Sequence, residues 1–414
     1  MSEYLVFLHA NQVVTVDAKY TTAENPLGVI PNGSMVVKDG SISWVGDTRD
    51  LDLSQYSDAK QIDCIGKTLL PGFIDSHTHP VFAGDRAAEF EQRLNGVSYQ
   101  DIAKAGGGIL HTVEATRRAS EDDLYESAKQ RLRTMMSFGV TTVEAKSGYG
   151  LDWETELKSL KVIQRLKNTL PLSVIATYMG AHDIPADYRQ QENGIDAYVD
   201  VLCTQDLPQL AKLGLADFVD VFCETGYFSV DQTRRILQTA KDLGFELKVH
   251  AEEFSDLGGA ALAAELGAMS ADHLLHINDK SITAMKESGT IATLLPGTAF
   301  YLRLSHYAPA KKILDIGVPV ALATDFNPGS CMTENLQWIM TLACFQMGMT
   351  PAQVIESVTL SGAKALGLEA DRGSLSPGKR ADIIQLDVPG YQHLFYHVGI
   401  NHLDSVWITG KKVE

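Results

Sequence analysis

The sequence predicts an α/β protein in which a (β/α)8 TIM barrel is joined to a smaller β domain built from both ends of the chain. Three observations favour this fold: the middle of the 414-residue chain alternates apolar runs with helical stretches, both ends read as short strands and turns, and no GxGxxG follows the first apolar run. We therefore expect a composite β-sandwich from residues 1–67 and 370–414, and a barrel over residues 68–369.

The N-terminal segment reads as short strands separated by tight turns. Residues 34–37 and 41–45 are strand-like and flank Asp39-Gly40, a dipeptide typical of hairpin turns. After about residue 370 the same pattern returns, in residues 373–387 and 405–409. Neither piece alone buries enough apolar surface to be stable, so we expect the two to form one β domain.

Between these ends, a polar cap, a helical stretch, a stop at glycine and an apolar strand recur in that order. Ser120 begins one such helix, which ends at Gly139 before an apolar run. The apolar runs give eight expected barrel strands: 69–75, 140–146, 172–178, 217–223, 246–250, 270–275, 290–295 and 319–325. Strands and helices alternating over roughly 300 residues fit a barrel with insertions better than an open doubly wound sheet.

Composition and charge exclude several classes of protein. The chain is 45% hydrophobic and 21% charged, which is ordinary for a globular protein, and its net charge of −17 would repel nucleic acid. It has no basic leader and no run of eighteen apolar residues, so we expect no membrane association. Five scattered cysteines without CxxC spacing favour reduced thiols and a cytoplasmic location. A homodimer is compatible with the sequence, which leaves the oligomeric state open.

Polar residues stand at the ends of several expected strands, where a barrel gathers its catalytic side chains. The first strand leads into His77-Thr-His79, and alternation along an extended chain puts the two imidazoles on one side. The fifth, sixth and eighth strands carry His250, His273 and Asp325. Imidazoles and one carboxylate, without a nearby cysteine, suit zinc or iron with one position left for water.

Each of these residues also has a purely structural explanation. An HxH motif is short and recurs by chance, His250 could be a core histidine, and Asp325 could be an ordinary turn aspartate. The barrel decides in favour of a metal site, because it would bring the ends of separately identified strands to one rim.

Longer segments resemble a known family. PGFIDSHTH at 71–79 is similar to the first-strand signature of the amidohydrolase superfamily, and PGKRAD at 377–382 resembles its closing β-domain motif. Within that superfamily, several segments resemble the imidazolonepropionases: VFAGDR at 81–86, GGGI at 106–109, KSGYG at 146–150, GAH at 180–182, HAEEF at 250–254 and TDFNPGS at 324–330. The resemblance covers nearly the whole chain.

This resemblance implies a metal-dependent cyclic amidohydrolase of histidine degradation, which hydrolyses 4-imidazolone-5-propanoate to N-formimidoyl-L-glutamate. It implies a zinc or iron ion on four ligands: His77, His79, His250 and Asp325. Binuclear members of the superfamily use a carboxylated lysine at the end of strand four, where this chain has Cys223-Glu224, so we expect one ion per chain. We expect Lys146, at the end of strand two, to support neighbouring loops.

For the chemistry, we expect Glu253 and His273 to position or deprotonate the attacking water, and Asp325 or His273 to protonate the departing ring nitrogen. Arg86 offers a bidentate fork for the propanoate tail, and a surface ion pair with Glu89 is the alternative. The remaining expected substrate contacts are Tyr149, His182, Glu253, Asn327, Gly329 and Ser330.

Two other functions fit parts of the pattern. A deaminase of a nucleobase or related heterocycle would share the histidines, the aspartate and the spacing from His250 to Glu253, but its neutral substrate would give Arg86 no carboxylate to hold. A non-catalytic relative could keep the barrel as a metal-binding or assembly module. Every ligand position is filled in this chain, which argues against that reading.

Overall fold

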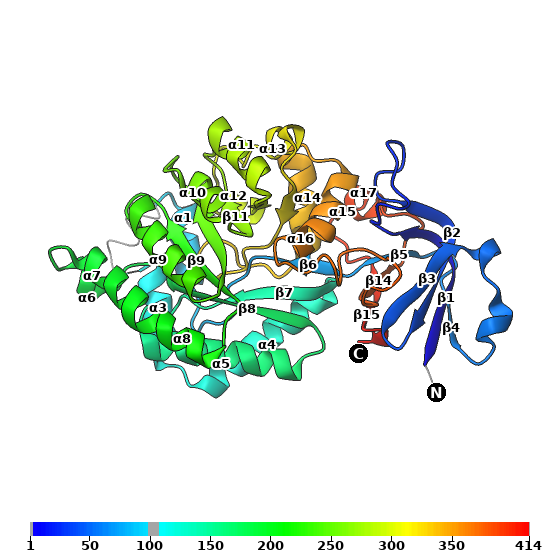
Figure 1. The fold of residues 1–414 in the computed structure, drawn as a ribbon, viewed down its shortest axis with the longest axis horizontal. Coiled ribbons are helices and arrows are strands. Elements are labelled where there is room, and N and C mark those ends of the chain that lie inside the picture. Colours follow the sequence, from blue (N-terminus) through cyan, green and yellow to red (C-terminus); the bar gives the residue numbers. More distant parts are fainter. Residues whose placement is uncertain (1–2, 98–106, 414) are drawn as a thin grey trace.

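The chain folds into a barrel of parallel strands and a separate mixed sheet (Figure 1). The structure is a computed structural model and describes residues 3–97 and 107–413. In Figure 1 the blue N-terminal strands and the red C-terminal strands lie together at the right of the view, beside the barrel. The predicted fold class is therefore confirmed.

The mixed sheet draws its strands from both ends of the chain. Its order is β16-β15-β14-β5-β1-β2-β3, with β4 paired to β1. The strands are β1 (Tyr4–Val14), β2 (Val29–Lys38), β3 (Ser41–Asp47), β4 (Lys60–Asp63), β5 (Thr68–Pro71), β14 (Ile383–Leu386), β15 (Leu403–Ile408) and β16 (Lys411–Lys412). The two ends meet where β14 pairs antiparallel with β5. The expected hairpin turn lies between β2 and β3, and both Asp39 (φ 50°) and Gly40 (φ 81°) are left-handed, as a type I′ turn requires.

The barrel contains eight strands, each paired in parallel with its neighbour in the sequence. They are β6 (Phe73–Asp75), β7 (Val140–Lys146), β8 (Ser173–Ala181), β9 (Phe218–Cys223), β10 (Glu246–Ala251), β11 (Ser270–His273), β12 (Ile291–Leu294) and β13 (Val320–Leu322). The segments just beyond β6 and β13 close the circle, because Asp325 N donates to His77 O (3.0 Å) and His79 N to Phe326 O (2.9 Å). This closure brings the HxH motif beside Asp325.

The run 69–75, expected as one barrel strand, is divided between the two sheets. β5 belongs to the mixed sheet and β6 to the barrel, with Gly72 between them. A Cβ atom at Gly72 would lie 2.2 Å from Thr141 Oγ1, so the crossing from one sheet to the other needs a residue without a side chain. The domain limits at residues 67 and 370 stay a prediction, and the mixed sheet includes β5 from beyond the first of them.

Helices follow most barrel strands and cover the outside of the barrel (Figure 1). The predicted cap Ser120 accepts a hydrogen bond from Asp123 N. The helices are α1 (Ala87–Leu94), α3 (Ile109–Arg118), α4 (Glu121–Ser137), α5 (Trp153–Thr169), α6 (Ala186–Arg189), α7 (Gly194–Val201), α8 (Leu207–Leu213), α9 (Val230–Asp242), α10 (Gly259–Leu266), α11 (Asp279–Ser288), α12 (Pro296–Tyr301), α13 (Ala310–Ile316), α14 (Leu336–Met347), α15 (Pro351–Ser357), α16 (Leu360–Lys364) and α17 (His393–Tyr396). Within the described ranges, none of them has the length and apolar character needed to cross a bilayer.

Candidate metal centre and active site

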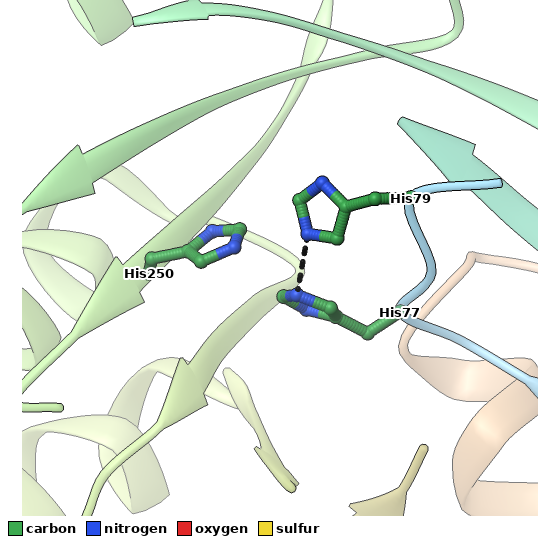
Figure 2. Close-up of side chains that lie close together, drawn as sticks. All are labelled: His77, His79 and His250. Atoms are coloured by element: carbon green, nitrogen blue, oxygen red, sulfur yellow. Dashed lines mark hydrogen bonds between the residues drawn. The ribbon is translucent and has the colours of Figure 1, made fainter. Parts of the chain in front are cut away.

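Three histidines converge inside the barrel at the carboxyl end of its strands. His77 and His79 lie on the segment that follows β6, and His250 lies on β10. Figure 2 shows their rings turned toward one another, with the Nε2 atoms of His77 and His79 3.4 Å apart. Each histidine offers a ring nitrogen within 4.8 Å of the others, and all three residues are buried. The predicted convergence of these residues is thus present in the fold.

Asp325 places a carboxylate oxygen close to two of these histidines. Its Oδ1 lies 3.4 Å from His77 Nε2 and 3.5 Å from His79 Nε2. Metal-to-nitrogen distances of about 2.1 Å in a tetrahedral site correspond to ligand separations of about 3.4 Å. The donor atoms of His77, His79 and Asp325 are therefore spaced like ligands of one cation, and His250 joins the same two histidines within 4.8 Å. His273 forms an overlapping group with His77 and Asp325, so it lies at the same centre.

Two carboxylates lie against the Nδ1 atoms of two of these histidine rings. Asp272 Oδ2 lies 2.6 Å from His77 Nδ1, and Asp220 Oδ2 lies 2.9 Å from His250 Nδ1. This arrangement, with one ring nitrogen on a carboxylate and the other facing the centre, is typical of metal-binding histidines. Neither aspartate was predicted from the sequence as part of the site. The signal was present, since each is a charged residue inside an apolar strand.

Lys146 lies below the same centre. Its Nζ is 2.7 Å from Glu144 Oε1 and 2.7 Å from Asp220 Oδ2, and its side chain is fully buried. Burial alone would lower the pKa of Lys146, but the carboxylates of Asp220, Glu144 and Asp272 outweigh it and raise the pKa. Lys146 was expected to support loops, whereas these ion-pair partners are carboxylates on barrel strands.

Burial sets the protonation of the site. It is the main cause that lowers the pKa of His77, His79 and His273 well below the usual value, and nearby cationic groups add to the effect. These imidazoles are neutral at physiological pH, which is the form that binds metals. Burial, reinforced by Asp325 and Glu224, raises the pKa of Glu253 well above its usual value and so favours the protonated form of this carboxyl group.

Several residues of the site have strained backbones. His273 (φ 79°), Leu274 (φ 62°), Asp325 (φ 51°) and Glu252 (φ 50°) all lie in the left-handed region. Such a conformation costs about 1–3 kcal/mol for each residue without special support, and it concentrates at functional sites. Support for Glu252 comes from its side chain, which accepts hydrogen bonds from Gly258 N and Ala260 N. The fold therefore holds these residues at the ends of their strands in an unfavourable backbone conformation.

A pocket opens over the metal-ligand candidates, and residues expected to contact the substrate line it. Its wall comprises His79, Arg86, Ile109, Tyr149, His182, Asp183, Phe222, Tyr227, His250, Glu253, Phe254, His273, Leu302, Asp325, Asn327, Gly329 and Ser330. Gly106, at the start of the expected GGGI segment, lies outside the described residues.

Arg86 lines this pocket and also pairs with Glu89. Its Nε lies 2.7 Å from Glu89 Oε2, and the two side chains are only 5% and 14% exposed. The expected alternatives, a carboxylate clamp and a surface ion pair, are therefore not exclusive. The pair exists, but it is buried in the pocket wall, where it orients the guanidinium.

Tyr149 and His182 come from the loops after β7 and β8. The rings of His182 and His79 stack with centroids 5.0 Å apart. His182 Nδ1 lies 2.9 Å from Gly148 O, and burial lowers the pKa of His182 to about 4. The loop is held from behind by Glu156 of α5, whose carboxylate accepts hydrogen bonds from Gly148 N, Gly150 N and Leu151 N. Sequence reasoning did not identify Glu156.

Asn327, beyond β13, uses its side chain to shape its own loop. Its Nδ2 donates to Asp325 O (2.7 Å) and Ser330 Oγ (2.9 Å), and its Oδ1 accepts from Gly329 N and Ser330 N. The amide thus ties the strained Asp325 to the pocket wall.

Comparison with known proteins agrees with this geometry. Residues 68–413 match the Amidohydrolase family. Two imidazolonepropionases, from Geobacillus sp. (strain WCH70) and from Clostridium tetani, are each 47% identical to this chain, with 99% of the chain and 97% and 98% of the relatives covered.

Solved structures share the fold at low sequence identity. A triazine hydrolase variant superposes with a TM-score of 0.75 at 17% identity, over 99% of this chain and 94% of that one. A zinc-bound adenosine deaminase from Xanthomonas campestris superposes with a TM-score of 0.72 at 17% identity, over 99% and 92%. With its full-length relatives at nearly half identity, the chain is a hydrolase that belongs to the imidazolonepropionase family of the amidohydrolases.

Proposed function

We propose that this chain hydrolyses the ring amide bond of 4-imidazolone-5-propanoate to give N-formimidoyl-L-glutamate. The observation that carries the proposal is a buried arginine, Arg86, in the wall of the same pocket as the histidine and aspartate centre. The centre suits amide hydrolysis, and the guanidinium suits a substrate that also carries a carboxylate. The name shared by the relatives at 47% identity supports the same substrate.

We propose that one zinc or iron ion is held by His77, His79, His250 and Asp325. The spacing of the donor atoms supports these ligands. The end of β9 carries no lysine, since the chain continues there with Glu224, and this supports a single ion. A bound cation supplies Lewis acidity, lowering the pKa of a water from about 15.7 towards 7.

The side chains around the centre would accept and donate the protons of the reaction. Asp325, which accepts a hydrogen bond from Thr298 Oγ1 (2.5 Å), is fixed in position to take a proton from the attacking water. His273 or Asp325 delivers a proton to the departing ring nitrogen. The balance is simple: the water oxygen bonds to the carbonyl carbon, the ring C–N bond breaks, and the nitrogen gains the proton.

Glu253 and His273 lie next to each other in the pocket wall. His273 Nε2 lies 3.7 Å from Glu253 Oε2, and among the described residues no group makes a hydrogen bond to His273 Nδ1. In the protonated form, which burial favours, Glu253 can donate a hydrogen bond to the substrate ring. We propose that the pair orients the amide and the incoming water.

The remaining wall residues would bind the substrate. We assign the propanoate tail to Arg86 and the planar ring to Tyr149 and His182, whose rings lie next to His79. Asn327, Gly329 and Ser330 also line this pocket, from the loop beyond β13. A nucleobase deaminase is the second candidate, because its substrate would use the same centre, but it leaves Arg86 without a role.

Ring opening can be followed directly. Freshly made imidazolone propanoate should lose its ultraviolet absorbance in the presence of metal-loaded protein, and mass spectrometry should find N-formimidoyl-glutamate as product. Ammonia release from nucleobases, without turnover of imidazolone propanoate, would instead identify a deaminase. The His77→Ala variant, purified identically, controls for a contaminating enzyme.

A further inference from the structure

Five charged residues are buried inside the barrel beneath the histidine centre. They are Glu144 and Lys146 of β7, Asp220 of β9, Lys248 of β10 and Asp272 of β11, and all their side chains are fully buried. The inside of a barrel is usually filled by branched apolar residues, and moving charges out of water is costly. Stability alone therefore gives no reason for this buried ion cluster.

The two lysines bind the three carboxylates together. Lys146 Nζ lies 2.7 Å from both Glu144 and Asp220, and 4.0 Å from Asp272. Lys248 Nζ lies 3.5 Å from Glu144 and 3.7 Å from Asp272. It also donates to Ser76 O (2.8 Å), the carbonyl that precedes His77. Each carboxylate is thus fixed from several directions.

The cluster ends on two of the candidate ligand rings. Asp272 Oδ2 lies 2.6 Å from His77 Nδ1, while its other oxygen accepts from Ser270 Oγ at 2.6 Å. Asp220 contacts His250 twice, since Oδ2 lies 2.9 Å from Nδ1 and Oδ1 accepts from the backbone N–H at 3.2 Å. The hydrogen bond to Asp272 keeps the ring proton of His77 on Nδ1 and leaves the Nε2 lone pair for a metal, whereas the 2.9 Å contact of Asp220 with His250 Nδ1 lacks hydrogen-bond geometry.

We propose that Asp272 is a positioning residue that fixes the Nδ1–H tautomer of His77, that Asp220 positions His250 through its backbone and ring contacts, and that Lys146 and Lys248 hold the two carboxylates in place. This inference rests on the ligand set of the proposed function.

Two substitutions at Asp272 separate this role from a merely structural one. In Asp272→Asn the side chain keeps its shape and can still accept from Ser270, but its NH2 group can face His77 Nδ1. That donor favours the tautomer with the proton on Nε2, which cannot bind a metal. Asp272→Ala leaves the ring without a partner but does not impose the wrong tautomer.

The readouts are the rate at which a chelator removes the metal and the melting temperature of the metal-free proteins. We expect metal loss to be fastest in Asp272→Asn, intermediate in Asp272→Ala and slowest in the wild type, with affinities reduced by about 10–100-fold. In the metal-free state, Asp272→Asn should melt at a higher temperature than Asp272→Ala, because asparagine preserves the packing. If Ala loses metal faster than Asn, or if Asn retains it like the wild type, the inference is wrong.

A control variant shows whether metal loss is specific to the buried ion cluster. Asp206→Asn removes another buried carboxylate, which accepts from Tyr178 OH (3.2 Å) away from the cluster, and should release metal at the wild-type rate. Equally fast loss from this control would overturn the inference. If Asp272 variants do not fold, Asp220→Asn and Asp220→Ala test the second carboxylate, and both should lose metal faster than the wild type; retention of metal at the wild-type rate in both would overturn the inference. Metal retention in His77→Ala would overturn the proposed ligand set, whereas metal loss there with retention in Asp272→Asn overturns only this inference.

Discussion

The guanidinium of Arg86 passes so close to Gly329 that a Cβ atom at this glycine would lie 2.2 Å from Arg86 Nη1. The loop beyond β13 and the loop beyond β6 are therefore fitted to each other at the pocket wall. Arg86 is held from the other side by Glu89, at 2.7 Å. Contacts on both sides therefore fix the orientation of the Arg86 guanidinium. The charge of Arg86 and its position can be tested with separate substitutions.

We predict that Arg86→Met weakens transition-state stabilisation by about 2–5 kcal/mol, as expected when one partner of a buried charge pair is lost. A surface pair would be worth less than about 1 kcal/mol. The measurement is kcat/KM on imidazolone propanoate and on an analogue without the carboxylate. Similar losses on both compounds would mean that Arg86 supports the loop and does not bind the tail.

Gly329→Ala should produce a milder form of the same defect. The new methyl group would force Arg86 to move, while the charge would remain in the pocket wall. We expect KM for the intact substrate to rise several-fold and KM for the carboxylate-free analogue to change little. An increase in KM for both substrates alike would show that the substitution disturbs the whole loop.

Glu156→Gln tests how the Tyr149 loop is held. The native carboxylate accepts from three backbone N–H groups, whereas a glutamine has one acceptor oxygen and turns its NH2 against one of them. A buried donor left without an acceptor costs about 1–3 kcal/mol. We expect a higher KM and unchanged metal content, measured by kinetics and elemental analysis. Loss of metal would place Glu156 in the support of the centre itself.

Asp206 should make stability depend on pH. Burial raises the pKa of this carboxyl from 3.8 to about 6, so the folded protein holds the proton more tightly than the unfolded chain does. The resulting stabilisation is complete below about pH 3.8 and is lost as the pH rises through about 6. Asp206→Asn is neutral throughout and should gain roughly 1–2 kcal/mol over the wild type at pH 8, with solvent screening allowed for, but little at pH 4. Melting temperatures at both pH values measure this, and an equal difference at both would contradict it.

His77→Ala and Asp325→Ala should each abolish turnover and leave the barrel folded, because both side chains lie at the rim of the strands, outside the packed apolar layers. Circular dichroism of the variants checks the fold, and the ring-opening assay checks activity. Wild-type rates in either variant would remove that residue from the proposed centre.

The sequence was most informative about the strands. All eight barrel strands were predicted, and the bounds of β7 agree with the expected run 140–146, because this run follows a clear helix end at Gly139. The break at Gly72 was not predicted, since hydrophobicity does not show which of two sheets a strand joins. Spacing indicated the Arg86–Glu89 pair but not its burial, which depends on the loop beyond β13.

The support beneath the site was harder to predict than the site itself. His77, His79 and Asp325 stand beyond strand ends, where a barrel places functional groups, and this position identified them. Asp220, Lys248 and Asp272 lie within apolar strands, and their meaning emerges only when neighbouring strands bring opposite charges together.

The central claim is that a single metal ion at this centre supports hydrolysis of imidazolone propanoate. Metal-free protein titrated with zinc or ferrous ion should gain ring-opening activity linearly and reach a plateau at one equivalent per chain, with elemental analysis finding the same ratio. A plateau at two equivalents, or full activity in the metal-free protein, would contradict the account.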